Sequence, residues 1–143
     1  MRMKRSIPAL PVFNIDRAVQ FYQEKLGFIS GYHDKGFAKL TRDDVELHLW
    51  AACDKAWKFR SIILFLKPIW SGAESFLAGT SSCRIEIEKI DDLFNEYKGK
   101  GVLYSPETKV EETSWRTREF PALDLHRNLL TFYEPTPNAG KGN

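Results

Sequence analysis

The chain has 143 residues, which is enough for one compact domain with its own core but too few for two domains of ordinary size. Its formal net charge is only +2 and its basic cluster, residues 2–5, is short, so the sequence argues against a nucleic-acid-binding protein. The longest apolar run, residues 62–66, is too short to cross a membrane.

The first half of the chain predicts a strand, a helix and three further strands. Residues 6–13 fit an edge strand, because their two prolines lack the N–H that pairing on both sides requires. Residues 14–28 place apolar side chains at helical spacing, with Asn14 or Asp16 as the cap and Gly27 at the end. The next three strands are expected at residues 28–34, 37–41 and 45–50.

The last of these strands, VELHLW, alternates strictly between two kinds of side chain. One face carries only aliphatic residues and must belong to the core. The other face carries Glu46, His48 and Trp50, which places a carboxylate, an imidazole and an indole side by side. This second face is the candidate functional surface.

The second half of the chain repeats the opening pattern at an offset of about 75 residues. Residues 83–102 again read as a strand followed by a helix, with Asp91 in the place of Asp16 and Gly101 in the place of Gly27. The remaining strands are expected at residues 104–109, 117–123 and 129–133.

This repeat predicts an α+β fold of two βαβββ modules, residues 6–50 and 82–134, within a single domain of residues 1–134. An irregular segment, residues 51–81, joins the modules, and the Pro- and Gly-rich tail 135–143 is expected to be flexible. Each module should form a curved sheet with a helix on its convex side, so that the modules together leave a concave cleft.

Several segments together resemble the bleomycin-resistance proteins of the vicinal-oxygen-chelate superfamily. They are ALPV, AVQFYQEKLGF, RDDVELHL, SCRIEIEKIDDL and SWRTREFPALDLHRNLLTF, within residues 6–134. The repeat and LGF mark the superfamily, which includes glyoxalases and ring-cleaving dioxygenases, whereas LPV, RDDV and W..REF in combination are more specific. The family's final turn often reads Asp-Pro-x-Gly-Asn. Here residues 124–128 read DLHRN, which is expected to alter the geometry of the turn.

The resemblance also implies where a metal would bind. Enzymes of the superfamily hold a divalent ion through four inward-facing His, Glu or Gln residues in the first and last strands of each half. Carried onto this sequence, those positions fall on Ala9, His48, Ser82 (or its neighbour) and Thr131. Only His48 is a competent ligand, and one good donor does not hold a divalent ion. We therefore expect no metal or other cofactor, and a protein that binds a ligand without transforming it.

The family's ring-stacking positions fall on Tyr32 and Trp115, with Phe37 beside them. Trp115 lies in a polar loop, which favours binding over packing, whereas Phe37 fits a core position equally well. From their shared face, His48 and Trp50 are expected to line the same cleft.

Three further residues complete the predicted ligand site. Trp57 and Phe59 either cover the cleft or form a small apolar cluster under a loop. Arg118 is a candidate ligand contact, with a surface ion pair as its alternative role.

The leading hypothesis is a protein that sequesters bleomycin-type antibiotics, whose flat rings need aromatic side chains and whose cationic tail needs carboxylates. The family further implies a homodimer that exchanges the first strand, with Pro11, between subunits. One alternative is a metal-dependent lyase, isomerase or dioxygenase using His48 with Glu46, and another is a binder of a different flat aromatic metabolite. Without a secretory signal or metal-type cysteine spacing, we expect a cytoplasmic location with reduced thiols.

Overall fold

The computed structural model describes residues 1–52 and 78–137, which form two modules of the same topology. The first module consists of β1 (Ala9–Val12), α1 (Ile15–Glu24), β2 (Ile29–His33), β3 (Phe37–Arg42) and β4 (Val45–Ala51), with strand order β1-β4-β3-β2. The second consists of β5 (Ser82–Glu86), α3 (Ile90–Lys100), β6 (Glu111–Glu112), β7 (Thr117–Leu123) and β8 (Leu129–Pro135), with strand order β5-β8-β7-β6. The predicted α+β fold of two βαβββ modules is confirmed.

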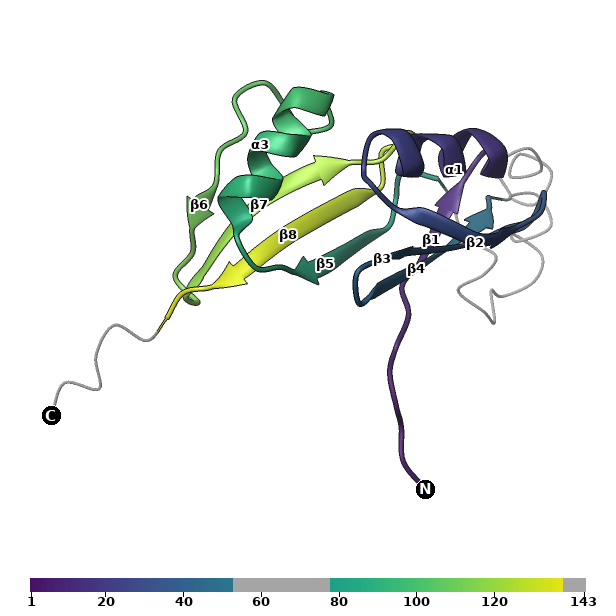
Figure 1. The fold of residues 1–143 in the computed structure, drawn as a ribbon, viewed down its shortest axis with the longest axis horizontal. Helices are drawn as coiled ribbons and strands as arrows, with labels where there is room; N and C mark the ends of the chain where they lie inside the picture. Colours follow the sequence, from purple (N-terminus) through teal and green to yellow (C-terminus); the bar gives the residue numbers. More distant parts are fainter. Residues whose placement is uncertain (53–77, 138–143) are drawn as a thin grey trace, which may run out of the picture.

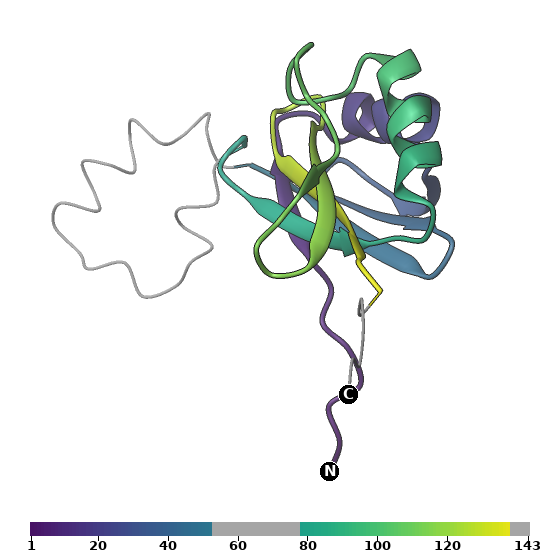
Figure 2. The same cartoon turned by 90° about the vertical axis from the view of Figure 1, so that its left-hand side faces the viewer.

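The two modules lie side by side, with α1 and α3 on the same side of the two sheets (Figure 1). A view turned by 90° again shows both helices on one side (Figure 2). We call the sheet face that points away from the helix the open face of each module. Within the described ranges, no helix is long and apolar enough to cross a membrane.

The helix-facing sides of both sheets contribute to one buried apolar cluster. Leu47 and Leu49 of β4 are fully buried in it, so the aliphatic face predicted from the alternation of VELHLW is confirmed. Ile85 of β5 and Phe132 of β8 belong to the same cluster, although they come from the other module. The modules are thus joined by a shared core.

The start of α1 and the end of α3 carry the signals that the sequence predicted, whereas the end of α1 does not lie where it was expected. Asn14, and not Asp16, caps α1, because its side-chain oxygen accepts a hydrogen bond from the N–H of Arg17 (3.0 Å). The helix ends at Glu24, four residues earlier than predicted, and Gly27 then turns the chain with a φ of 75°. Gly101 ends α3 as predicted, in the left-handed conformation (φ 70°) that glycine adopts without strain.

Two boundaries and one strand predicted from the sequence are wrong. Residues 6–8 precede β1, which begins at Ala9. Residues 104–109 do not form a strand, because Pro106 lies in a turn in which the N–H of Thr108 donates to the carbonyl of Ser105 (3.1 Å). The predicted flexible tail starts too early: residue 135 still belongs to β8, and residue 136 donates its N–H to a carbonyl of the turn before β7 (3.0 Å).

Two tyrosines at equivalent places in the repeat cross from one module to the other. Tyr22 of α1 donates its hydroxyl to Asp124, in the turn between β7 and β8 (2.9 Å). Tyr97 of α3 donates its hydroxyl to the carbonyl of Leu26, at the end of α1 (2.8 Å). Both side chains are fully buried, and burial raises the pKa of each phenol, so both remain neutral donors.

The turn at residues 124–128 joins several distant segments. Its Asp124 carboxylate accepts hydrogen bonds from Tyr22, from the Asn128 amide and from two backbone N–H groups of the turn. The fully buried Asn128 also donates to the carbonyl of Pro11 in β1 (2.7 Å) and accepts from the N–H of Gly79 (3.1 Å). The turn keeps the terminal Asp and Asn of the family pattern, and those two residues make these bonds.

Candidate functional site

The open face of the first module carries four of the predicted ligand residues. Phe37 of β3 is directly opposite Trp50 of β4, and Lys39 is opposite His48. The Phe37 ring lies 5.0 Å from the Trp50 ring and 4.9 Å from the His48 ring, both edge to face. Tyr32 extends the cluster, with its ring 6.4 Å from that of Phe37. We call Tyr32, Phe37, His48 and Trp50 the aromatic cluster.

Tyr32 reaches this face through an irregularity in β2. In a regular strand Tyr32 would lie on the same side of the sheet as Ser30, two residues before it. Ser30 pairs with the buried Leu40, whereas Tyr32 pairs with Lys39, because a register shift at Gly31 inserts one extra residue. Such a β-bulge reverses the alternation of the side chains that follow it. The bulge therefore turns Tyr32 toward the open face.

The aromatic cluster is exposed to an unusual degree for large apolar side chains. Tyr32 is 57% exposed and Trp50 is 47% exposed. Ile29, at the edge of the same face, is 68% exposed. Apolar side chains that gather on an open surface mark a place where a ligand or another protein binds.

A carboxylate with several cationic neighbours lies next to the aromatic cluster. Glu46 accepts a hydrogen bond from His48 (2.9 Å) and forms ion pairs with Arg5 (2.9 Å) and Lys39 (3.7 Å). The hydrogen bond from His48, followed by the charges of Arg5 and Lys39, lowers the pKa of Glu46. At the other end of the aromatic cluster, the Tyr32 hydroxyl donates to the carboxylate of Asp34 (2.9 Å), so the face carries charges of both signs.

The strand registers correct one of the four positions at which superfamily enzymes bind a metal. In the first module Ala9 of β1 pairs with His48 of β4. The equivalent pair in the second module is Arg84 of β5 with Thr131 of β8, so Arg84 takes the place that was predicted for Ser82. A guanidinium donates hydrogen bonds and has no lone pair for a metal. These residues do not fit a metal centre, and no group of three or more His, Cys, Asp or Glu within the described ranges is placed to hold one.

The open face of the second module carries charged residues that the sequence analysis did not select. The guanidinium of Arg84 lies over the Tyr133 ring, 4.7 Å from its centre, and donates to Glu119 (2.7 Å). Glu86 accepts a hydrogen bond from the Tyr133 hydroxyl (3.2 Å). The alternation of SCRIE, with Cys83 and Ile85 buried, was the signal that could have placed Arg84 and Glu86 on this face.

Trp115 and Arg118 lie in the second module but on different sides of it. Trp115 is 62% exposed and donates a hydrogen bond to Glu119 on the open face. Arg118 donates to both carboxylate oxygens of Asp91, at the start of α3 (2.8 Å each), so its guanidinium lies on the helix side of β7. Of the two predicted roles for Arg118, the structure shows the ion pair and does not bring the residue to the open face.

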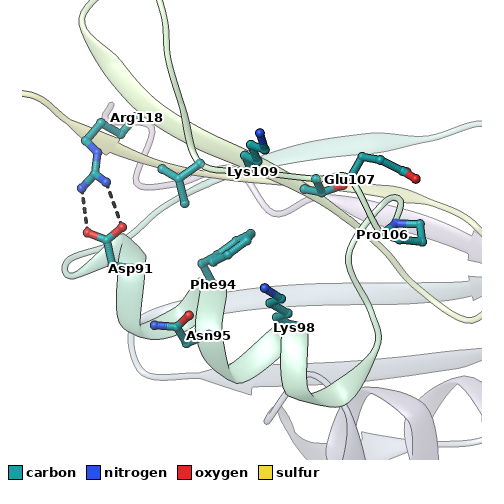
Figure 3. A pocket seen from close by; sticks show the side chains of 10 residues that line it. Asp91, Phe94, Asn95, Lys98, Pro106, Glu107, Lys109 and Arg118 are labelled. Carbon is teal, nitrogen blue, oxygen red and sulfur yellow. Dashed lines mark hydrogen bonds and ion pairs between the residues drawn. The ribbon is translucent and has the colours of Figure 1, made fainter.

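A pocket of about 450 Å³ lies beside this ion pair, between α3 and residues 106–110. Figure 3 shows Asp91 and Arg118 at one end of it and Phe94 pointing from α3 toward the loop. The pocket is on the helix side of the second module, so it is separate from the aromatic cluster. Trp57 and Phe59, the remaining predicted ligand residues, lie outside the described residues.

Comparisons with known proteins identify the family. No protein-family model matches the sequence. A bleomycin resistance protein of Geobacillus stearothermophilus is 45% identical over 132 residues, which covers 92% of this chain and 97% of the relative. A protein of the same name from Staphylococcus aureus (strain MRSA252) gives the same values. The chain belongs to the family of bleomycin resistance proteins.

A solved structure supports the fold assigned to this chain. The bleomycin-binding protein of Streptomyces verticillus, crystallised with copper(II)-bleomycin, has a TM-score of 0.68 and 21% identity, over 96% of this chain and 99% of that one. At this identity the comparison concerns the fold, which is the fold that the sequence predicted. The family resemblance carried by segments such as ALPV and RDDV is confirmed by the two relatives at 45% identity.

Proposed function

We propose that this protein binds bleomycin-type antibiotics and protects by sequestering them. The observation that carries the proposal is the exposed aromatic cluster on the open face of a chain that belongs to the bleomycin resistance family. Flat rings stack on such side chains, and each contact adds about 0.5–1.5 kcal/mol beyond the burial of area. Tight binding without turnover lowers the concentration of free drug by mass action.

The charges of the two open faces support one orientation of the ligand. The face of the first module combines aromatic rings with the cations Arg5 and Lys39, which Glu46 and the carboxylate of Asp34 beside Tyr32 balance. The face of the second module carries Glu86, Glu119 and Arg84. We propose that the rings of the antibiotic lie on the aromatic cluster and its cationic tail extends toward the carboxylates of a second-module face.

We propose a binding role and not a catalytic one, because of the chemistry of the four positions that hold the metal in superfamily enzymes. An alanine, an arginine and a threonine accompany His48 there, and His48 is already hydrogen-bonded to Glu46. This set does not offer the converging donors that a Lewis-acid mechanism needs.

The proposal includes a cytoplasmic homodimer in which β1 is exchanged between subunits. Among the described strands of one chain, β1 is an edge strand that pairs with β4 alone, and Pro11 is the partner of Trp50. An edge strand next to the aromatic cluster is suited to exchange, because the same hydrogen bonds form with the β4 of a second copy. Trp115 of one subunit would then complete the site on the open face of the other.

The test is a calorimetric titration with metal-free and copper(II)-loaded bleomycin. We expect saturation near one ligand per chain. Trp50→Ala and Trp115→Ala should each weaken binding about tenfold, since a stacked indole is worth about 1.4 kcal/mol or more.

Tyr104→Ala is the matched control, because Tyr104 is an exposed aromatic residue (59%) outside the predicted site. It should bind like the unsubstituted protein. Absence of binding at micromolar concentration to either form of the drug would refute the proposal, and equal losses in all three variants would refute the location of the site.

A further inference from the structure

We propose that His126 is a pH-sensitive switch for the attachment of β1: its neutral imidazole packs the turn between β7 and β8 against the end of β1, and protonation of the ring loosens that attachment. The switch lies where the two modules meet and uses none of the residues of the aromatic cluster, so it does not depend on the proposed function. Three features of the ring support it: the side chain that it packs against, a nitrogen without a partner, and the strand that its turn holds.

The His126 ring packs against Phe13 at the end of β1. The two ring centres lie 5.6 Å apart, with the rings edge to face at an angle of 61°. Phe13 follows the last residue of β1 and precedes Asn14, the cap of α1. Phe13 is 54% exposed and does not belong to the buried core, so its contact with His126 helps to hold the chain where β1 ends.

The Nδ1 atom of the His126 ring is buried and has no hydrogen-bond partner among the described residues. A neutral imidazole carries one N–H, and because Nδ1 has no acceptor beside it, we place the proton on Nε2. An imidazolium carries an N–H on both nitrogens. Protonation would thus create a buried, unpaired N–H on a charged ring, which a site removed from water disfavours.

The carboxylate of the same turn, Asp124, is already fully engaged. Its Oδ1 accepts hydrogen bonds from the backbone N–H groups of His126 and Asn128, both at 2.9 Å. Its Oδ2 accepts from the Tyr22 hydroxyl and from the Asn128 amide, also at 2.9 Å. A carboxylate oxygen has two lone pairs, so none is left for a new N–H at Nδ1 of His126.

The charges that face the ring come from the turn itself and from α1. Burial, the largest effect, lowers the pKa of His126, while the carboxylate of Asp124 raises it and the guanidinium of Arg17 in α1 lowers it. Phe13 and Gly79, the other described residues that approach His126, carry no charge. The folded protein therefore keeps this imidazole neutral down to a lower pH than the unfolded chain does.

The turn that carries His126 also holds β1. Two residues further on, Asn128 donates its amide to the carbonyl of Pro11 (2.7 Å). β1 lies at the edge of its sheet and, among the described strands, pairs with β4 alone. Pro11 and Phe13 are therefore points at which the second module supports β1, and a charged ring that moves toward water weakens both.

The direction of the effect follows from the lowered pKa. The attachment is complete above the pKa of histidine in the unfolded chain, about 6.5, and weakens as the pH falls from there toward the lower pKa of the folded state. At pH 5.5 a histidine of ordinary pKa is about ten times more often charged than neutral, so about tenfold is the upper limit of the effect at that pH. The first strand should thus detach more readily in mildly acidic solution.

The experiment measures amide hydrogen exchange of the full chain by NMR at about pH 7.5 and pH 5.5. Rates are expressed as protection factors, so that the intrinsic pH dependence of exchange cancels. The reporters are the amides of His48 and Ala52, whose hydrogen bonds attach this part of the chain to residues 8 and 12. We expect their protection to fall about fivefold at the lower pH, while that of Leu40, in the centre of the sheet, changes by less than about twofold.

His126→Phe keeps a ring beside Phe13 that cannot be protonated, so its protection factors should be the same at both pH values. His33→Gln is the matched control, because His33 lies beside Asp16 (3.6 Å) on β2, at the opposite edge of the sheet from β1. This variant should keep the pH dependence of the unsubstituted protein. The Cε1–H chemical shift of His126 in the unsubstituted protein gives its pKa independently of any variant, and we expect a value below about 6.5.

Several results would each overturn the proposal. They are a pKa of His126 at or above about 6.5, protection of β1 that does not change with pH, and an equal loss of protection at Leu40. A pH dependence that persists in His126→Phe would overturn it as well, because it would assign the effect to His48, the pairing partner of Ala9 in β1.

Discussion

Arg127 has a backbone φ of 68°, a left-handed conformation that side chains with a Cβ adopt only at a cost. The family pattern Asp-Pro-x-Gly-Asn places glycine at this position of the turn, and glycine is free of that cost. The departure noted in the sequence thus puts an arginine, with strain, where the family pattern has glycine.

Arg127→Gly should therefore stabilise the protein by about 1 kcal/mol, the approximate cost of a left-handed residue. Urea denaturation measures the change in the free energy of unfolding. Leu125→Gly is the control in the same turn: Leu125 has no positive φ, so glycine there should destabilise the fold through the entropy of the unfolded chain. A destabilising Arg127→Gly would contradict the argument.

Glu119 makes stability depend on pH. The guanidinium of Arg84, with hydrogen bonds from Thr117 and Trp115, holds the pKa of this carboxyl below its ordinary value. The unfolded chain therefore binds a proton at a higher pH than the folded protein does. The pair stabilises the fold above the unfolded-state pKa, about 4.3, and this contribution is lost as pH falls through the lower pKa of the folded state.

We expect Glu119→Gln to lower the Tm at pH 6 and to lose this effect as the pH falls below 4. Thermal unfolding at pH 6, 5, 4 and 3 measures it. Arg84→Met, which removes the partner and leaves the carboxylate, should reproduce the flatter acid limb. A difference in Tm that stays constant between pH 6 and pH 3 would show that the pair does not contribute in this way.

At the scale of secondary-structure elements, α1 and α3 each connect the two modules through the hydroxyl of a tyrosine. The two acceptors differ in the donors that remain when that hydroxyl is removed. The Asp124 carboxylate accepts from one hydroxyl, that of Tyr22, and otherwise from N–H groups, so changing Tyr22 removes its hydroxyl donor. The carbonyl of Leu26, by contrast, accepts from Tyr97 and also from Arg42 (2.6 Å), so it keeps a donor if Tyr97 is changed.

Tyr22→Phe should therefore cost about 1–3 kcal/mol, because it leaves a buried carboxylate oxygen with one donor fewer. Tyr97→Phe should cost about 1 kcal/mol, the net value of an ordinary hydrogen bond. Both variants keep the ring, so each is the other's control for packing. Denaturant unfolding gives the two free energies, and the reverse order would show that the network around Asp124 is not the stronger of the two connections.

At the scale of the whole molecule, Asn128 links the turn between β7 and β8 to the first strand of the chain. Its amide donates to Pro11 and Asp124 and accepts from the N–H of Gly79. Asn128→Ala would leave two buried groups, the carbonyl of Pro11 and the carboxylate of Asp124, and the N–H of Gly79 without this partner, and we expect a loss of about 3 kcal/mol.

The same substitution should loosen β1 before the rest of the sheet. Hydrogen exchange at the amides of His48 and Ala52, which donate to the carbonyls of Pro8 and Val12, reports on the attachment of β1 to β4. Exchange there should accelerate more than at Leu40, in the centre of the sheet. Uniform acceleration across the sheet would mean that Asn128 supports the fold in general and not β1 in particular.

The sequence by itself determined the modules, the end of α3 at Gly101, and the two faces of β4 that place His48 and Trp50 together. It narrowed the cap of α1 to Asn14 or Asp16, and the structure selected Asn14. These features depend on the spacing of residues a few positions apart, and that spacing can be seen directly in the chain. The resemblance identified the family and pointed to Tyr32 and Trp115 as ligand residues. Both side chains are exposed in the structure.

Only the tertiary structure decided which side chains meet. The extra residue at Gly31 turned Tyr32 to the open face, Asp91 drew Arg118 to the helix side, and Arg84 paired with Glu119. The connections of Tyr22 to Asp124 and of Asn128 to Pro11 join residues 102 and 117 positions apart. Contacts of this kind arise from how the modules pack and leave no periodic signal in the chain, so local spacing does not predict them.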